Sequence, residues 1–182
     1  LSSAFHASPF AEAAVVSVDG FGDFASAAWG VGRDTDAEIC DRVHFPHSLG
    51  IFYQAITQFI GFPNYGDEYK MMGLAPLGAP THLEDMRRIV LLDDGGGFRL
   101  NLDCFRHHRE KIEYEWESGS PTVGALYSAR LAELLGPPRG AEEPLEQRHR
   151  DIARSAQAMY EEAFFHLLAA LHRRCGLDAV AI

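Results

Sequence analysis

The sequence contains few cysteines and no long hydrophobic run, and both absences narrow the classes of protein that it can encode. Its three cysteines, Cys40, Cys104 and Cys175, are widely separated and odd in number, so they suggest neither a zinc ribbon nor a disulfide framework. The longest apolar runs are far too short to cross a bilayer. We therefore expect a cytoplasmic protein that has no membrane partner.

Positive charge is scarce as well. With 16 Lys and Arg against 26 Asp and Glu, the chain carries a formal net charge of -10, which argues against nucleic acid as its main partner. The length of 182 residues is enough for one domain, and 47% of the residues are hydrophobic and can fill a core. The composition therefore predicts one globular domain that does not have nucleic acid as its main partner.

Both ends of the sequence look cut. The chain opens at Leu1 without a methionine, and its first ten residues lack the basic and long apolar regions of a signal peptide. It closes on the apolar, strand-like run 178–182, where a natural terminus rarely stops. We therefore interpret residues 1–182 as a single partial domain, truncated at both ends, whose partner is the remainder of the same polypeptide.

Hydrophobic patterning predicts an α/β fold that begins with three strands. The near-continuous apolar run 13–18 is typical of a strand buried on both faces. The Asp19-Gly20 pair that follows predicts a turn, and residues 21–23 complete a tight reversal. Residues 24–31 and 38–43 are predicted to form two further strands, which makes three consecutive antiparallel strands.

The rest of the chain is predicted to be mainly helical. An amphipathic helix begins after Ser48, which can cap it, and ends at Gly61. Further helices are predicted over 81–92, 121–135 and about 147–175, with a strand at Ala179. Thr81 and Glu84 match a capping box. The last predicted helix becomes apolar all round at Phe164, Phe165, Leu168 and Leu171, which indicates burial against a sheet.

The segment that follows the helix ending at Gly61 carries an acid, a base and two glycines. Glu68 and Lys70 lie two apart, so in an extended segment they would point to one face. Gly66 and Gly73 would let the backbone approach a ligand closely. We interpret the segment as a loop that can hold a phosphate or an adenylate, with Glu68, Lys70 and Gly73 as cofactor-binding residues. The alternative is a solvated ion pair, which is usually worth at most about 1 kcal/mol and needs no function.

Other polar clusters are weaker candidates. The triple glycine 95–97 lacks the strand, lysine and helix context of a phosphate loop and is interpreted as a hairpin tip. His44 and His47 have a spacing that can serve a metal on a helix, but Pro46 disfavours the helix that they would need. The pair 107–108 falls in the highly charged segment 106–120, which is predicted to be an excursion over the surface. These histidines are therefore interpreted as structural.

Asp19 is the most specific single candidate for a functional residue, although its pattern leaves two interpretations open. A carboxylate at the end of a buried strand, followed by glycine, is a common position for a metal ligand. An ordinary Asp-Gly turn is as frequent.

Four stretches of the sequence together resemble one enzyme family. They are SSAFHASPF at 2–10, VSVDGFGD at 16–23, FPHSLGIFYQAITQFIGF with GDEYKMMGLAPLG within 45–78, and DIARSAQAMYEE at 151–162. In their residues and in their order along the chain, these stretches resemble those of the nodulation-type and antibiotic-tailoring O-carbamoyltransferases.

The resemblance implies a fold and a reaction. The fold would be an actin-like ATPase half-domain, of the ribonuclease H-like class, with three antiparallel strands, a following helix and a helical insertion. A separate domain would make carbamoyl adenylate from carbamoyl phosphate and ATP, and the actin-like domain would pass the carbamoyl group to a hydroxyl of a small acceptor. The alternative is a nucleotide-binding actin-like module, kinase-like or similar to the tRNA threonylcarbamoyl transferases.

The resemblance also implies a metal site. Asp19 would join two histidines upstream of Leu1 and a later aspartate in holding iron or another divalent ion.

Overall fold

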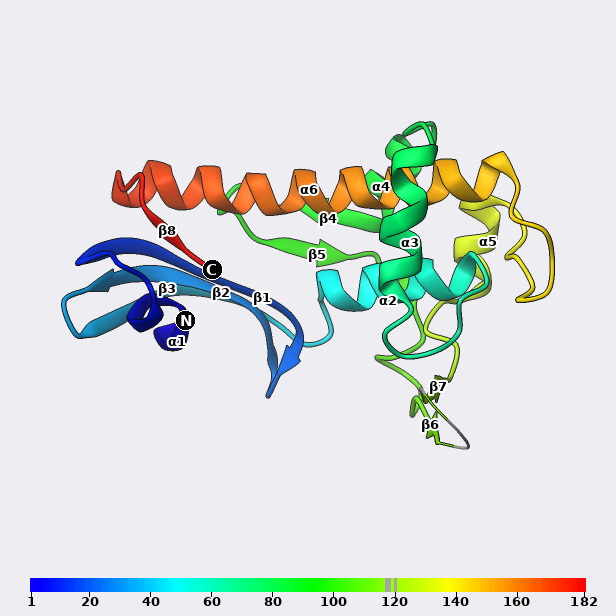
Figure 1. Cartoon of the computed structure of the whole chain (residues 1–182), viewed down its shortest axis with the longest axis horizontal. Coiled ribbons are helices and arrows are strands. Elements are labelled where there is room, and N and C mark those ends of the chain that lie inside the picture. The colour runs from blue at the N-terminus through cyan, green and yellow to red at the C-terminus, as the bar shows by residue number, and fades with distance from the viewer. Residues whose placement is uncertain (117–118, 120) are drawn as a thin grey trace. The chain divides into compact units, whose positions relative to one another are not determined.

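The computed structural model describes residues 1–116, 119 and 121–182 and shows a mixed α/β protein (Figure 1). The helices are α1 (Ser2–Ala7), α2 (Leu49–Phe59), α3 (Glu68–Leu74), α4 (Leu83–Ile89), α5 (Ala129–Leu135) and α6 (Gln147–Cys175), with 3-10 helices η1 (Ala75–Leu77) and η2 (Leu102–Cys104). The strands are β1 (Glu12–Gly22), β2 (Ala25–Arg33), β3 (Asp36–His44), β4 (Val90–Leu92), β5 (Phe98–Leu100), β6 (Tyr114–Glu115), β7 (Thr122–Val123) and β8 (Val180–Ala181).

The chain forms two compact units. The first contains residues 1–50, 92–99 and 162–182, and the second contains residues 51–91 and 100–161.

The first unit is built on a four-stranded sheet with the order β3-β2-β1-β8. β1 pairs antiparallel with β2, β2 pairs antiparallel with β3, and β8 pairs parallel with β1. The three predicted strands and the strand near Ala179 are therefore confirmed. The predicted reversal over 19–23 begins too early, because β1 continues to Gly22 and the turn falls at Asp23 and Phe24. Asp23 adopts a positive φ of 56°, which a two-residue hairpin turn requires.

A small apolar cluster lies between α1 and the sheet. Phe5 on α1 packs with Ala13 and Val15 on β1 and with Ala181 on β8. A Cβ atom at Gly32 on β2 would lie 2.5 Å from the ring of Phe5, so this close approach requires glycine. The N-terminal helix is thereby fixed on one face of the sheet.

The prediction for the longest helix is confirmed in its bounds and wrong in one respect. α6 runs from Gln147 to Cys175, and its end belongs to the first unit, where Figure 1 shows it beside the sheet. Leu167 and Leu171 are buried, whereas Phe165 is 64% exposed, so this turn is not buried all round. No helix in the described part of the chain is both long and apolar enough to cross a membrane.

The triple glycine forms the turn between β4 and β5, as predicted. Asp93 Oδ1 accepts hydrogen bonds from the N–H groups of Gly95 and Gly97, both at 2.9 Å. A Cβ atom at Gly96 would lie 2.5 Å from that of Ala170 on α6. The hairpin tip therefore packs closely against the helix.

The end of α2 in the second unit is set by Gly61, as predicted. The N–H of Gly61 donates to the carbonyl of Gln58 at 2.9 Å, and the N–H of Phe62 donates to that of Thr57 at 3.1 Å. This pair of bonds is the Schellman arrangement, and Gly61 provides the positive φ of 88° that it needs.

Two predicted helices are shorter than expected. The helix predicted over 81–92 is α4, which ends at Ile89, because Val90 begins β4. The predicted capping box of Thr81 and Glu84 is wrong, since the N-cap residue is His82 and Glu84 pairs with Arg87.

The helix predicted over 121–135 is α5, which begins only at Ala129. Thr122 and Val123 form β7 and pair with β6, and Ser128 caps α5 by accepting a hydrogen bond from the N–H of Arg130 at 3.1 Å. Residues 117, 118 and 120 of the predicted surface excursion 106–120 lie outside the described residues.

Candidate functional site

Asp19 lies in the first unit, at an irregularity of the β1 and β2 pairing. The register runs regularly to Val18 opposite Ala27 and then shifts before Gly22 pairs with Ala25. Bulges of this kind bend a strand and redirect its side chains. The carboxylate of Asp19 is exposed, and its Oδ1 accepts a hydrogen bond from the N–H of Gly20 at 2.6 Å. Together with Ser17, Asp23 and Ser26, Asp19 lines a cavity of about 430 Å³.

The start of α2 packs directly on this irregularity. The hydroxyl of Ser48 donates to the carbonyl of Gly20 at 2.7 Å and to that of Asp19 at 3.2 Å. A Cβ atom at Gly50 would lie 2.8 Å from the Cα of Gly20, so only glycine permits this approach. The backbone beside the Asp19 carboxylate is therefore held in place by the residues around the helix start.

Glu68, Lys70 and Gly73 lie together in α3, in the second unit. The prediction that Glu68 and Lys70 share one face of an extended segment is wrong, because residues two apart in a helix point about 200° apart. The helix forms here because Met71 is fully buried and anchors it. Its first turn closes when the N–H of Lys70 donates to the carbonyl of Asp67 at 2.9 Å.

Lys70 is paired with a buried carboxylate that the sequence analysis missed. Its Nζ lies 2.7 Å from Asp67 Oδ1, and the side chain of Asp67 is only 7% exposed whereas that of Lys70 is 35% exposed. The hydrogen bond that Lys70 donates to Asp67 raises the pKa of Lys70 above its ordinary value, which favours the charged ammonium. The spacing of three residues could have indicated this pair, because residues three apart are neighbours on a helix.

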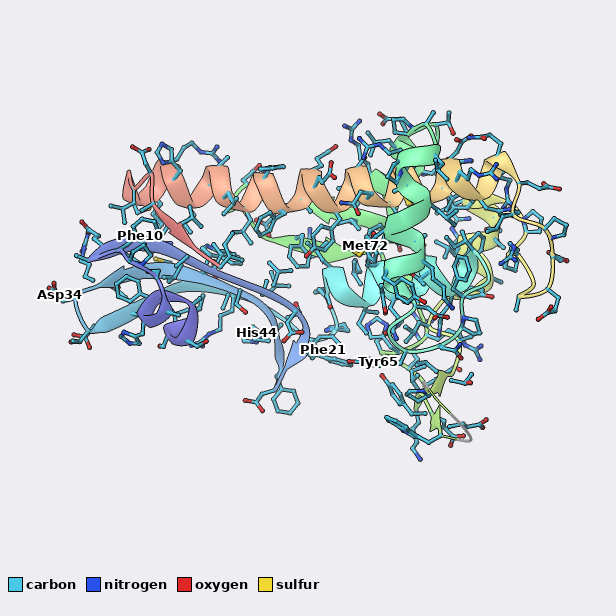
Figure 2. The ribbon with its side chains drawn as sticks, viewed as in Figure 1. Phe10, Phe21, Asp34, His44, Tyr65 and Met72 are labelled. Atoms are coloured by element: carbon cyan, nitrogen blue, oxygen red, sulfur yellow. The ribbon has the colours of Figure 1, made fainter. Side chains whose placement is uncertain are left out.

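Gly73 and its neighbour Met72 form an open surface on α3. A Cβ atom at Gly73 would meet no heavy atom within 4 Å, so packing within this chain does not require glycine. Met72, labelled in Figure 2, is 56% exposed. This part of α3 is therefore accessible to a ligand.

Glu68 is half-buried and lies near a group of aromatic and polar side chains from α2 and α6. Burial raises the pKa of Tyr53, and the nearby charges of Tyr160, Glu161 and Glu68 raise it further. The hydroxyl of Tyr53 donates to Gln157 Oε1 at 2.8 Å. Glu68 and Lys70, the acid and the base of α3, thus have different surroundings.

The loop after α3 is held against the N-terminal half of α6. Asp151 Oδ1 accepts a hydrogen bond from the N–H of Ala79 at 2.8 Å, and Ser155 Oγ accepts one from the N–H of His82 at 3.0 Å. A Cβ atom at Gly78 would lie 2.1 Å from the carbonyl oxygen of Arg150. Two of the four recognised stretches, 66–78 and 151–162, therefore meet in space.

A model of the carbamoyltransferase N-terminus family matches residues 1–180. The chain belongs to this family. It is 35% identical over 183 residues to the uncharacterized protein sll1178 of Synechocystis, 31% over 167 residues to the nodulation protein NolNO of Sinorhizobium fredii, and 32% over 183 residues to the nodulation protein NolO of Bradyrhizobium diazoefficiens. These alignments cover 100%, 91% and 99% of the chain but only 28%, 21% and 29% of the relatives, so the chain spans less than a third of their length. The resemblance seen in the sequence is confirmed.

In this carbamoyltransferase N-terminus, Asp151 and Ser155 are further residues that the sequence analysis did not single out. The hydrogen bond from the N–H of Ala79, together with one from the side chain of Gln147, lowers the pKa of Asp151. Asp151 and Ser155 lie four apart on α6 and so share one face, which is the only sequence pattern that could have suggested a joint role.

The histidines of the carbamoyltransferase N-terminus do not gather into a metal site within the described residues. Across 1–116, 119 and 121–182, no group of three or more His, Cys, Asp and Glu side chains could hold a metal ion. His44 ends β3 and is exposed (Figure 2). His108 is half-buried, and burial lowers its pKa, which favours the neutral ring.

Proposed function

We propose that this chain is part of an O-carbamoyltransferase. It would pass a carbamoyl group from carbamoyl adenylate to a hydroxyl of a small-molecule acceptor. The family match over residues 1–180 is the observation that carries this proposal. The chain spans less than a third of its relatives, so a separate domain of the same polypeptide would make the adenylate from carbamoyl phosphate and ATP.

We also propose that residues 1–182 are one partial N-terminal domain of the actin-like ATPase, ribonuclease H-like class. The strand order β3-β2-β1-β8 supports this assignment, because three antiparallel strands are followed by a fourth that runs parallel to β1. The long helix α6 precedes β8 and makes the crossover that a parallel pairing needs.

Transfer from a mixed anhydride makes two demands on a protein. The carbonyl that is attacked must be polarised, and the acceptor oxygen must be held in line with it. Lys70 suits a donor phosphate, because its ammonium stays charged and remains partly exposed. Gly73 lies one turn further along α3, where the open backbone would let the adenylate approach. Glu68 is the third proposed cofactor-binding residue, on a different face of the same helix.

Asp19 is proposed as a ligand of iron or another divalent ion. The part of the chain that the structure describes does not fit a complete site, because it holds no group of three or more candidate ligands. One carboxylate gives weak binding, since affinity depends on the number and geometry of the ligands. Asp19 would therefore contribute one ligand to a site whose other ligands come from outside these residues.

The experiment that tests the proposal is Lys70→Ala in the full-length enzyme, assayed with synthetic carbamoyl adenylate. Supplying the adenylate bypasses its synthesis, so a remaining defect lies in the transfer step. We expect a loss of about 10- to 100-fold, because a charge-assisted contact to a ligand is worth about 1.5 to 3 kcal/mol. Lys70→Ala leaves the largely buried Asp67 carboxylate without this partner and lowers stability, so circular dichroism must show that the variant is folded under the conditions of the assay.

Lys111→Ala is the matched control, because Lys111 is the other lysine of the chain and is 87% exposed in a loose 3.7 Å pair with Glu113. It should transfer at the wild-type rate. If Lys70→Ala does so too, the ion pair has only a structural role. If the wild-type enzyme binds nucleotide but forms no carbamoylated product, the alternative of a nucleotide-binding actin-like module is correct.

A further inference from the structure

We propose that Asp67 and Phe62 are positioning residues that aim the Lys70 ammonium at the donor phosphate. This inference rests on the proposed contact between Lys70 and carbamoyl adenylate. It adds two residues that act through the lysine.

Contacts other than the one to the lysine hold Asp67 in place. Its Oδ1 lies 2.7 Å from Lys70 Nζ, and its Oδ2 accepts a hydrogen bond from the N–H of Asn64 at 3.1 Å. The N–H of Asp67 in turn donates to the carbonyl of Asn64 at 3.2 Å. Both carboxylate oxygens and the backbone are therefore engaged, so the side chain has one orientation.

Phe62 bounds the ammonium on a second side. The ring centroid of Phe62 lies 5.5 Å from Lys70 Nζ, within the range of a cation–π contact. The guanidinium carbon of Arg139 lies 5.5 Å from the same ring, and Arg139 Nη1 donates to the carbonyl of Ile60 at 3.1 Å. The ring thus contacts a second, hydrogen-bonded cation as well as the lysine.

This geometry leaves the ammonium with donors for a ligand. A lysine ammonium has three N–H donors, and Asp67 accepts one of them. Its side chain remains 35% exposed, so the other donors can reach a phosphate from the solvent side.

The pair differs from an ordinary surface ion pair in its burial. Lys111 and Glu113 are 3.7 Å apart with side chains 87% and 69% exposed, so both ends of that pair are solvated. Asp67 is 7% exposed, and a buried carboxylate is unfavourable unless it is paired and hydrogen-bonded. A buried acid that holds a partly exposed base is an arrangement that orients the base.

The first test observes the lysine side chains of the chain by NMR, with Asp67→Asn compared to wild type. Asparagine keeps the shape and an acceptor for the N–H of Asn64 but removes the charge. Lys70 and Lys111 are the only lysines in the sequence, so their signals can be separated. We expect the Lys70 ammonium signal to move and its pKa to fall, while Lys111 stays unchanged. An unmoved Lys70 signal would refute the positioning role.

The second test measures transfer from synthetic carbamoyl adenylate in the full-length enzyme. Asp67→Asn should lower kcat/KM by about tenfold, as expected for the loss of one charge-assisted hydrogen bond. In a Lys70→Ala background the same change should have no further effect, because Asp67 acts only through the lysine. Phe62→Leu leaves the ion pair intact and should lower kcat/KM by about two- to fivefold.

The outcomes distinguish this inference from the function on which it rests. If Lys70→Ala is defective but Asp67→Asn and Phe62→Leu transfer at the wild-type rate, the lysine acts without positioning and the inference is wrong. If Asp67→Asn costs as much without Lys70 as with it, Asp67 is merely structural. If Lys70→Ala itself is as active as wild type, the proposed phosphate contact fails, whatever the NMR signals show.

Discussion

Gly78→Ala should destabilise the protein through one steric contact. The backbone at Gly78 has φ -115° and ψ 172°, an extended conformation that any residue adopts, so glycine is not needed for its dihedral angles. The new Cβ atom would instead lie 2.1 Å from the carbonyl oxygen of Arg150 and 2.8 Å from the backbone nitrogen of Asp151. These are backbone atoms of α6, so they cannot rotate away.

The cost follows from one of two effects. Inserting a methyl group into a well-packed contact costs about 1 to 3 kcal/mol. If the loop shifts to relieve the clash, it weakens the 2.8 Å hydrogen bond from the N–H of Ala79 to Asp151. A hydrogen bond to a charged group contributes about 1.5 to 3 kcal/mol, so whether the clash stays or the loop shifts, we expect a loss of about 1 to 3 kcal/mol in the free energy of unfolding.

Gly73→Ala is the matched control, since it adds the same methyl group five residues earlier. Gly73 lies inside α3, and a Cβ atom there would meet nothing within 4 Å. Alanine is favoured over glycine in a helix by up to about 1 kcal/mol, so this variant should be slightly more stable than wild type. Urea denaturation followed by circular dichroism measures both free energies. Equal effects of the two changes, or a Gly78→Ala variant within about 0.5 kcal/mol of wild type, would refute the reasoning.

Two further predictions concern unfolding by acid and the binding of ferrous iron. The amide of Ala79 and the side chain of Gln147 lower the pKa of Asp151, so its stabilising effect is present above about pH 4, the ordinary range of an aspartate, and is lost as the pH falls through the lower folded-state pKa. Acid unfolding curves of wild type and Asp151→Asn should therefore converge at low pH, and parallel curves would contradict this. Ferrous iron should bind this chain weakly at Asp19 and more tightly to a chain extended upstream through the expected histidines. Calorimetric titration that finds equal, tight binding in both would show that the site lies elsewhere.

The sequence predicted best those elements whose pattern is local. The strands around 13–18, 24–31 and 38–43 share strong apolar or alternating patterns, and the structure places them in one sheet. The helix over 147–175 was predicted with its observed bounds, because its apolar stripe is long and Gly176 follows it. Long periodic segments outweigh single-residue exceptions.

Short elements were predicted less well, because contacts distant in sequence decide them. α3 has only seven residues, lies between a turn and the 3-10 helix η1, and is helical because Met71 is buried. Val90 leaves the helical pattern of α4 because it pairs in a hairpin, and Thr122 leaves that of α5 for the same reason. Tertiary pairing overrides weak local propensity in such segments.

The candidate site shows the same division. Glu68, Lys70 and Gly73 could be chosen from residue type and spacing, and their binding roles stay predictions. Asp67 was not predicted, because its role depends on its burial, and the burial of a charged residue in a polar segment cannot be predicted from the sequence. Asp151 is more than 70 residues from the loop that it holds, and no local pattern indicates that contact.

The contacts between α6 and the loop after α3 constrain the number of residues in that loop more strictly than they constrain the identity of its side chains. Gly78 against Arg150, Ala79 with Asp151 and His82 with Ser155 meet successive turns of one rigid helix. An insertion or deletion between them would break the match for every later contact at once, whereas a substitution of Leu77, whose side chain is 62% exposed, keeps the spacing of these contacts. That position, in η1 directly after α3, therefore suits a cysteine for a fluorescent label, which would report on this segment without altering the length of the loop.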